Sequence, residues 1–157
     1  MPNVSVFVDV QNVYYTTRSS FGKNFDYNRF WAHVSQQYQI TQAFAYAVDK
    51  NDEKQKQFQN ILRAIGFEVK LKPYIQRADG SAKGDWDVGI AVDMMEYAAQ
   101  SDAMILVSGD GDFDILVERI KHKYNIPVEV YGAPSLTAAS LQRAASRFTP
   151  IDHSLLL

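Results

Sequence analysis

The chain has 157 residues, of which 46% are apolar and 22% charged, so it is expected to fold as one ordinary domain and not to be disordered. The net charge of −2 implies no particular partner. The absence of cysteine excludes disulfide scaffolds, thiol catalysis and cysteine-ligated zinc or iron–sulfur sites. We expect a single domain over residues 1–157, with its core at about 3–148 and a short C-terminal tail at 149–157.

The first half of the chain alternates strand and helix patterns. Residues 4–10 form a short β-branched run typical of a buried strand. Asp26 is a suitable N-cap for a helix whose apolar residues reach Tyr38, and residues 40–48 return to a strand pattern. A helix then runs from Asn51 or Asp52 to Gly66. Residues 67–75 alternate apolar and polar side chains like a strand, and residues 76–84 are a polar loop.

The second half continues the alternation. We predict helices over residues 88–98, 115–124 and 136–146, and strands over residues 103–107 and 126–131. Strands that alternate regularly with helices favour a mostly parallel sheet with helices on both faces, a three-layer α/β/α fold. Such sheets bind ligands beyond the carboxyl ends of their strands.

Aspartate is unusually frequent and clustered. The chain has 13 Asp against 5 Glu, and eight of the Asp fall between residues 79 and 114. Asp9 ends the first predicted strand, and Asp110 and Asp112 follow the fourth, so we expect these three at the ligand-binding edge. Carboxylates held close together repel one another, and a bound cation relieves that repulsion. Oxygen ligands favour Mg²⁺ or Mn²⁺, and such a centre suits phosphodiester hydrolysis.

Several residues near these acids also have purely structural interpretations. We expect Gly109 and Gly111 to let the backbone turn sharply beside the acids. Asp112 has the alternative role of N-cap to the next helix. Asp85 and Asp114 are expected to be solvated surface acids.

Three segments carry a family resemblance. They are Val6-Phe7-Val8-Asp9-Val10-Gln11-Asn12, Lys83-Gly84-Asp85-Trp86-Asp87-Val88 and Ser108-Gly109-Asp110-Gly111-Asp112-Phe113. Together they resemble the motifs of NYN domains, which are PIN-like nucleases, and most closely those of the LabA-like branch (DUF88). The match covers roughly residues 3 to 148. Gly111 stands where the family often has Ser.

The resemblance implies a PIN-like sheet with strand order 3-2-1-4-5 and metal-dependent ribonuclease chemistry. By position, it makes Asp9, Asp87 and Asp110 the core metal-binding acids, with Asp112 completing the catalytic site and Asn12 orienting a substrate phosphate. Asp93 also matches a family position. Six residues of helix turn through about 600°, however, which points Asp93 about 120° away from Asp87. We therefore expect Asp93 to lie behind the ligands or to accept hydrogen bonds from backbone donors.

The charges are segregated along the chain in a way that suits an RNA substrate. Residues 50–83 carry eight bases and four acids, whereas residues 84–118 carry nine acids and no base. Basic flanks bind phosphates without regard to base sequence. Tyr14 and Tyr15 follow Asn12 and could stack on unpaired bases, with ordinary packing as the alternative. Lys83 is expected to contact a phosphate, and Ser108 to line the substrate site.

The sequence thus favours a cytoplasmic, magnesium- or manganese-dependent ribonuclease that acts on single-stranded or structured RNA. Two alternatives stay open: a DNA nuclease or phosphatase that uses the same acids, and a regulatory RNA- or protein-binding module with little turnover. No apolar run is long enough to cross a membrane, and the N-terminus does not resemble a signal peptide. The apolar C-terminal residues 151–157 either cover the edge of the core or form a homodimer contact.

Overall fold

The main sheet is parallel throughout and carries the acidic segments at one end. The computed structural model describes residues 1–73, 75–76, 82–83 and 85–157, with residues 75–76 and 82–83 as backbone only. Within this part of the chain, the sheet order is β3-β2-β1-β6-β7-β8. All neighbouring strands in that order are parallel. The strands are β1 (Asn3–Asp9), β2 (Gln39–Asp49), β3 (Glu68–Pro73), β6 (Ala103–Val107), β7 (Val128–Gly132) and β8 (Arg147–Pro150).

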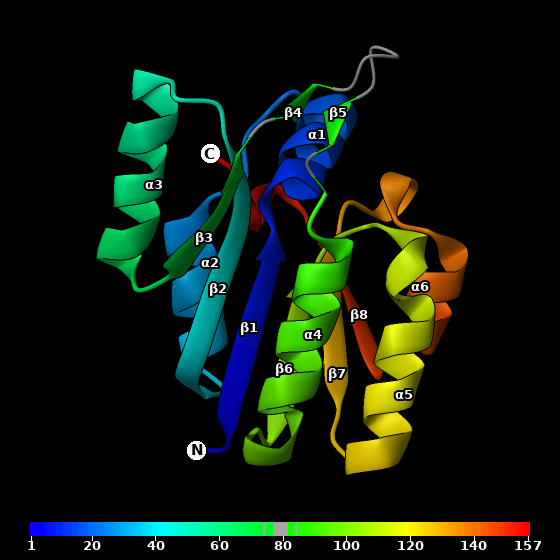
Figure 1. The fold of residues 1–157 in the computed structure, drawn as a ribbon. Helices are drawn as coiled ribbons and strands as arrows, with labels where there is room; N and C mark the ends of the chain where they lie inside the picture. Colours follow the sequence, from blue (N-terminus) through cyan, green and yellow to red (C-terminus); the bar gives the residue numbers. More distant parts are fainter. Residues whose placement is uncertain (74, 77–81, 84) are drawn as a thin grey trace.

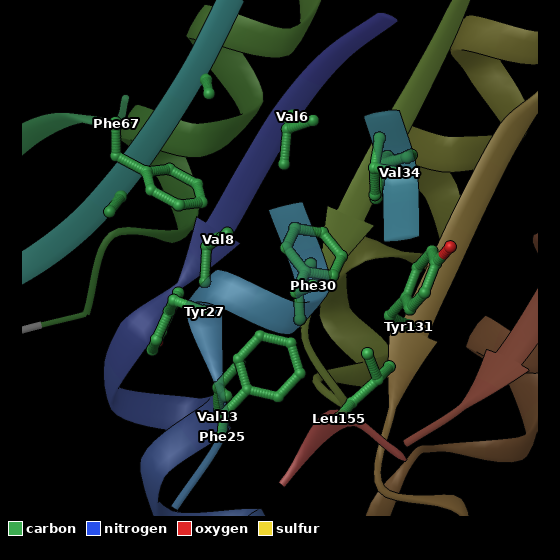
Figure 2. Close-up of a cluster of buried hydrophobic side chains, with 14 of the residues drawn as sticks. Val6, Val8, Val13, Phe25, Tyr27, Phe30, Val34, Phe67, Tyr131 and Leu155 are labelled. Carbon is green, nitrogen blue, oxygen red and sulfur yellow. The ribbon is translucent and has the colours of Figure 1, made fainter. Parts of the chain in front are cut away.

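Helices cover both faces of this sheet, which confirms the predicted three-layer fold. Figure 1 shows α4 (Asp87–Tyr97) and α5 (Asp114–Tyr124) across one face, with α2 (Tyr27–Ser35) and α3 (Glu53–Ile65) on the other. Successive residues of β1 point to opposite faces, as the strand period requires. Val6 and Val8 pack in the cluster under α2 and α3 that Figure 2 shows, whereas Phe7 packs under α4 and α5.

The predicted strand order is confirmed as far as it goes, because β1 lies between β2 and β6, the second and fourth strands of the main sheet. The sixth strand, β8, was not expected from the sequence. It pairs with β7 over Glu129–Gly132 and Arg147–Pro150, and buried Glu129 accepts hydrogen bonds from Arg147 of β8 and Tyr38. Helix α6 (Ala139–Ala144) is correspondingly shorter than predicted, since the chain becomes extended at Ala145.

Helix α1 (Val10–Phe21) is the largest element that the sequence prediction missed. It begins directly after Asp9, in a stretch for which the sequence predicted no helix. Its residues are mostly β-branched, aromatic or hydroxyl-bearing, and these types have low intrinsic helix propensity. Packing holds the helix instead: Val13 and Thr17, one turn apart, are both buried, and the Thr17 hydroxyl donates to the Val13 carbonyl at 2.8 Å.

The C-terminal residues close one edge of the core. Ile151, Leu155 and Leu156 are buried, and Leu156 forms an antiparallel bridge with Phe25. In the predicted polar loop after β3, β4 (Ile75–Gln76) and β5 (Ala82–Lys83) pair as a short antiparallel hairpin. No helix in the described residues is both long and apolar enough to span a membrane.

Candidate metal centre

Three aspartates from separate parts of the chain meet at the carboxyl end of the sheet. Asp9 ends β1, Asp110 follows β6, and Asp87 is the first residue of α4. β1 and β6 are parallel neighbours paired at Val8 and Val107, so the residues that follow them emerge side by side. Each acid offers one carboxylate oxygen, and these oxygens all lie within 4.8 Å of one another. The sequence prediction named these same three acids.

Burial and mutual repulsion disfavour ionisation of this cluster. Burial raises the pKa of Asp9 to about 6, although hydrogen bonds from Ser108 and the Asn12 backbone lower it and the charges of Asp110 and Asp85 raise it further. Desolvation raises the pKa of Asp87 to about 7, aided by the nearby carboxylates of Asp110, Asp85 and Asp9. A divalent cation would replace these protons and remove the repulsion. Three converging carboxylates therefore fit Mg²⁺ or Mn²⁺ as a donor set.

Asn12 and Ser108 link the loops that carry the acids. The Ser108 hydroxyl donates to Asp9 Oδ2 at 3.1 Å and accepts the Asp110 N–H at 3.2 Å. The Asn12 side-chain oxygen accepts the Gly109 N–H at 2.8 Å, which ties the start of α1 to the loop after β6. Ser108 is 1% exposed, so its hydroxyl is directed to protein groups. Ser108 thus contacts both acids directly, and Asn12 holds Gly109, the residue before Asp110.

Gly109 and Gly111 are needed for a different reason from the one expected. Neither has a positive φ angle; among the described glycines that conformation occurs at Gly22 and Gly66. What the two residues lack is room for a side chain. A Cβ on Gly109 would lie 2.5 Å from the carbonyl oxygen of Leu136, and a Cβ on Gly111 would lie 2.8 Å from the Cβ of Ala138. These glycines therefore do not use a left-handed conformation, and close packing against the segment before α6 is the constraint that the structure shows.

Asp112 lies beside the cluster but outside the group of three. It is exposed, and its backbone N–H donates to Asp110 Oδ1 at 2.9 Å within the short 3₁₀ turn Gly111–Phe113. Asp110, and not Asp112, is thus the residue that caps this turn. The alternative role of Asp112 as N-cap of the next helix is wrong, since the position before α5 is Phe113, without a side-chain cap.

Asp93 faces the edge strand β3. Its carboxylate accepts the Tyr46 hydroxyl at 2.8 Å and pairs with the Lys70 ammonium at 2.7 Å. Its partners are therefore side chains, where backbone donors were one expectation, and it does not belong to the group of three acids. Lys70 occupies the polar side of the predicted strand 67–75, and that alternation was the available signal for this contact.

The remaining predicted residues are more dispersed. Tyr14 and Tyr15 are 55% and 64% exposed, so ordinary core packing does not explain them. Asp85 is exposed as expected, yet its charge raises the pKa of both Asp9 and Asp87. Asp114 accepts the N–H of Ile115 at the start of α5. The Lys83 side chain lies outside the described residues.

Comparisons with known proteins connect this geometry with a family. The NYN domain family model matches residues 3–152. The protein LabA ("low amplitude and bright protein") of Synechococcus elongatus is 25% identical over 157 residues, which cover 95% of this chain and 83% of LabA.

Solved structures support the architecture. A crystal structure of a Vibrio parahaemolyticus protein of unknown function, VPA0982, is 56% identical, covers 99% of this chain and 96% of its own, and superposes with a TM-score of 0.94. Acinetobacter baumannii MurG, 14% identical with a TM-score of 0.51, covers 94% of this chain and 41% of its own. That second likeness shows the fold alone.

Proposed function

This chain belongs to the NYN domain family of PIN-like nucleases, and on that premise we propose that it is a metal-dependent ribonuclease. The observation that carries the proposal is the convergence of Asp9, Asp87 and Asp110 within 4.8 Å at the carboxyl end of the sheet. These acids would hold Mg²⁺ or Mn²⁺. When bound, the ion would activate water and neutralise the charge that develops on the phosphate.

The neighbouring residues have supporting roles in this proposal. Ser108 holds Asp9 and Asp110 in place, and Asn12 holds the loop after β6. Asp112 completes the acid set as an exposed carboxylate beside Asp110. We further assign Asn12 to the floor of the substrate site, with buried Ser108 supporting that floor from beneath through Asp9 and Asp110. Lys83 is assigned to a phosphate contact on the basis of the sequence.

Single-stranded or structured RNA is the proposed substrate because its unpaired bases can stack on aromatic side chains. Tyr14 and Tyr15 stand exposed on α1, the helix that begins directly after Asp9. A cytoplasmic location and a homodimer remain predictions, and the lack of cysteine is compatible with the first. For the second, the burial of Ile151, Leu155 and Leu156 favours the core role of the C-terminal residues.

Cleavage of end-labelled RNA and of DNA with the same sequence tests the proposal. Each substrate is incubated with Mg²⁺, Mn²⁺ or EDTA, using wild type, Asp110→Asn and Glu96→Gln. Glu96 is an exposed acid of α4, the helix that carries Asp87, and serves as the matched control. We expect RNA cleavage with either metal by wild type and Glu96→Gln, and none with EDTA or Asp110→Asn.

The other outcomes favour the alternatives. Cleavage that survives EDTA or Asp110→Asn contradicts a metal nuclease. Preferential cleavage of DNA favours the DNA nuclease. Retention of RNA without cleavage under every condition favours a binding module.

A further inference from the structure

The acidic cluster depends on the placement of Asp87, which differs from its partners in how it is anchored. Asp9 is the last residue of central strand β1, and Asp110 lies three residues after the end of central strand β6. Asp87 begins helix α4 and is preceded by Asp85 and Trp86, which belong to no strand. The backbone N–H of Asp87 is 3.4 Å from Asp85 Oδ1, a long contact. Ile90 and Met94 hold the body of α4 in the core, and the residue before Asp87 adds contacts that hold its first turn.

Trp86 supplies that anchor. It is the N-cap residue of α4, and its carbonyl accepts the first helical N–H, from Ile90, at 2.7 Å. Its side chain makes no helix cap. Instead, the indole Nε1–H donates to the carbonyl of Ala47 in β2 at 2.9 Å. The residue before Asp87 is thereby bonded to the strand beside β1.

Three further contacts hold the indole ring. The ring of Tyr46 lies 5.3 Å away, centroid to centroid, at an interplanar angle of 60°. The Lys72 ammonium lies 4.6 Å from the ring centroid and donates to the Asp85 carbonyl at 3.1 Å. Gly89 leaves space for the ring, since a Cβ there would lie 2.5 Å from Trp86 Cε3. The ring is thus held from β2, from β3 and from its own helix.

We infer that Trp86 is a positioning residue that sets where the Asp87 carboxylate stands relative to Asp9 and Asp110. The inference rests on the proposed function, in that Asp87 is one of the metal ligands. Trp86 acts through the backbone of its neighbour. Residues that orient metal ligands typically change metal affinity about 10- to 100-fold when they are replaced.

The chain offers a matched control in Trp31, its second tryptophan. Trp31 also lies against a glycine, since a Cβ on Gly66 would be 2.6 Å from its ring. The ring centroids of Trp31 and Phe67 are 5.1 Å apart. Trp31 packs in the cluster under α2 and α3, whereas Trp86 packs in the cluster on the other face of the sheet. Both rings are partly buried and packed on a glycine, but we expect only the loss of Trp86 to release Asp87.

The test is Mn²⁺ affinity, measured by electron paramagnetic resonance of free Mn²⁺ at a temperature where circular dichroism shows each variant folded. Trp86→Ala should weaken Mn²⁺ binding at least tenfold. Trp86→Phe keeps an aromatic ring but loses the bond to Ala47 and part of the ring contacts, so its affinity should lie between those of Trp86→Ala and wild type. Trp31→Ala should bind as wild type does. Equal affinity of Trp86→Ala and Trp31→Ala would overturn the inference.

A crystal structure of Trp86→Ala separates this inference from the proposed function. Displacement of Asp87 from Asp9 and Asp110 supports the positioning role even if wild type binds no Mn²⁺, a result that would count against the metal centre alone. An Asp87 carboxylate still within the cluster would contradict the positioning role, whatever the metal affinity.

Discussion

Single residues decide the geometry of the acidic cluster. The sequence predicted Asp9 and Asp110 because the first ends, and the second closely follows, a recognisable buried strand. Asp87 was identified as a candidate ligand only through the family resemblance. Trp86 and Lys72 could not be predicted in the same way, because the Trp86 partner in β2 is 39 residues distant and no local pattern identifies it.

Gly111 provides a residue-scale test of close packing. Gly111→Ala should lower the free energy of unfolding by about 1–3 kcal/mol, because the new methyl would stand 2.8 Å from the Cβ of Ala138. Removing that methyl with Ala138→Gly should restore much of the loss in the double variant. Urea unfolding of the two single variants and the double variant measures the coupling, and strictly additive losses would refute a steric origin.

The raised pKa values predict a pH dependence of stability. In the metal-free protein, Asp9 and Asp87 hold protons more tightly than they do in the unfolded chain, where the ordinary pKa is 3.8. Their contribution to stability is therefore greatest at low pH, falls as the pH rises from about 4 to 7, and is level above that. Melting temperatures across this range should show a shallower fall for Asp87→Asn than for wild type. Identical slopes would show that Asp87 has no raised pKa.

At the scale of elements, burial patterns in the strands were more informative than helix propensity. Strand β6 agrees with its predicted bounds. Its five residues are a continuous apolar run, and the acidic loop begins soon after them. Helix α1 was missed because its Val, Thr, Tyr and Ser residues have low helix propensity and packing overrides it. Strand β8 was missed because its register depends on pairing with β7, a contact between distant parts of the chain.

The C-terminal segment gives an element-scale prediction with adjacent leucines as test and control. Leu156 is 2% exposed and Leu157 is 70% exposed. Leu156→Ala should cost about 2–5 kcal/mol of unfolding free energy because it leaves a cavity beside Phe25, whereas Leu157→Ala should cost less than about 0.5 kcal/mol. Denaturant midpoints measure both, and similar small losses would show that the segment is not part of the core.

On the scale of the whole molecule, basic and acidic residues lie in different elements of the fold. The basic residues of segment 50–72 belong to α3, β3 and the turn between β2 and α3, whereas the acid-rich segment 85–118 contains α4 and the first part of α5. A polyanion is therefore expected to approach from the α3 and β3 side. This division was visible in the sequence, but its placement on either side of β1 needed the fold.

Charge reversal tests the direction of approach. Lys54→Glu, at the start of α3, should weaken RNA binding, and the difference from wild type should shrink with added salt. Arg119→Glu, on α5 directly after the acid-rich segment, makes the same charge change away from α3 and β3 and should have a smaller effect. Fluorescence anisotropy with Asp110→Asn protein measures binding without cleavage. A larger loss for Arg119→Glu would reverse the proposed direction.

The central claim is that Asp9, Asp87 and Asp110 together hold a divalent metal ion. A crystal soaked in Mn²⁺ and measured for anomalous scattering tests it most directly. We predict an anomalous peak bonded to carboxylate oxygens of all three residues, absent from crystals of Asp110→Asn. The absence of a peak at this cluster, or a peak that persists in Asp110→Asn, would contradict the claim.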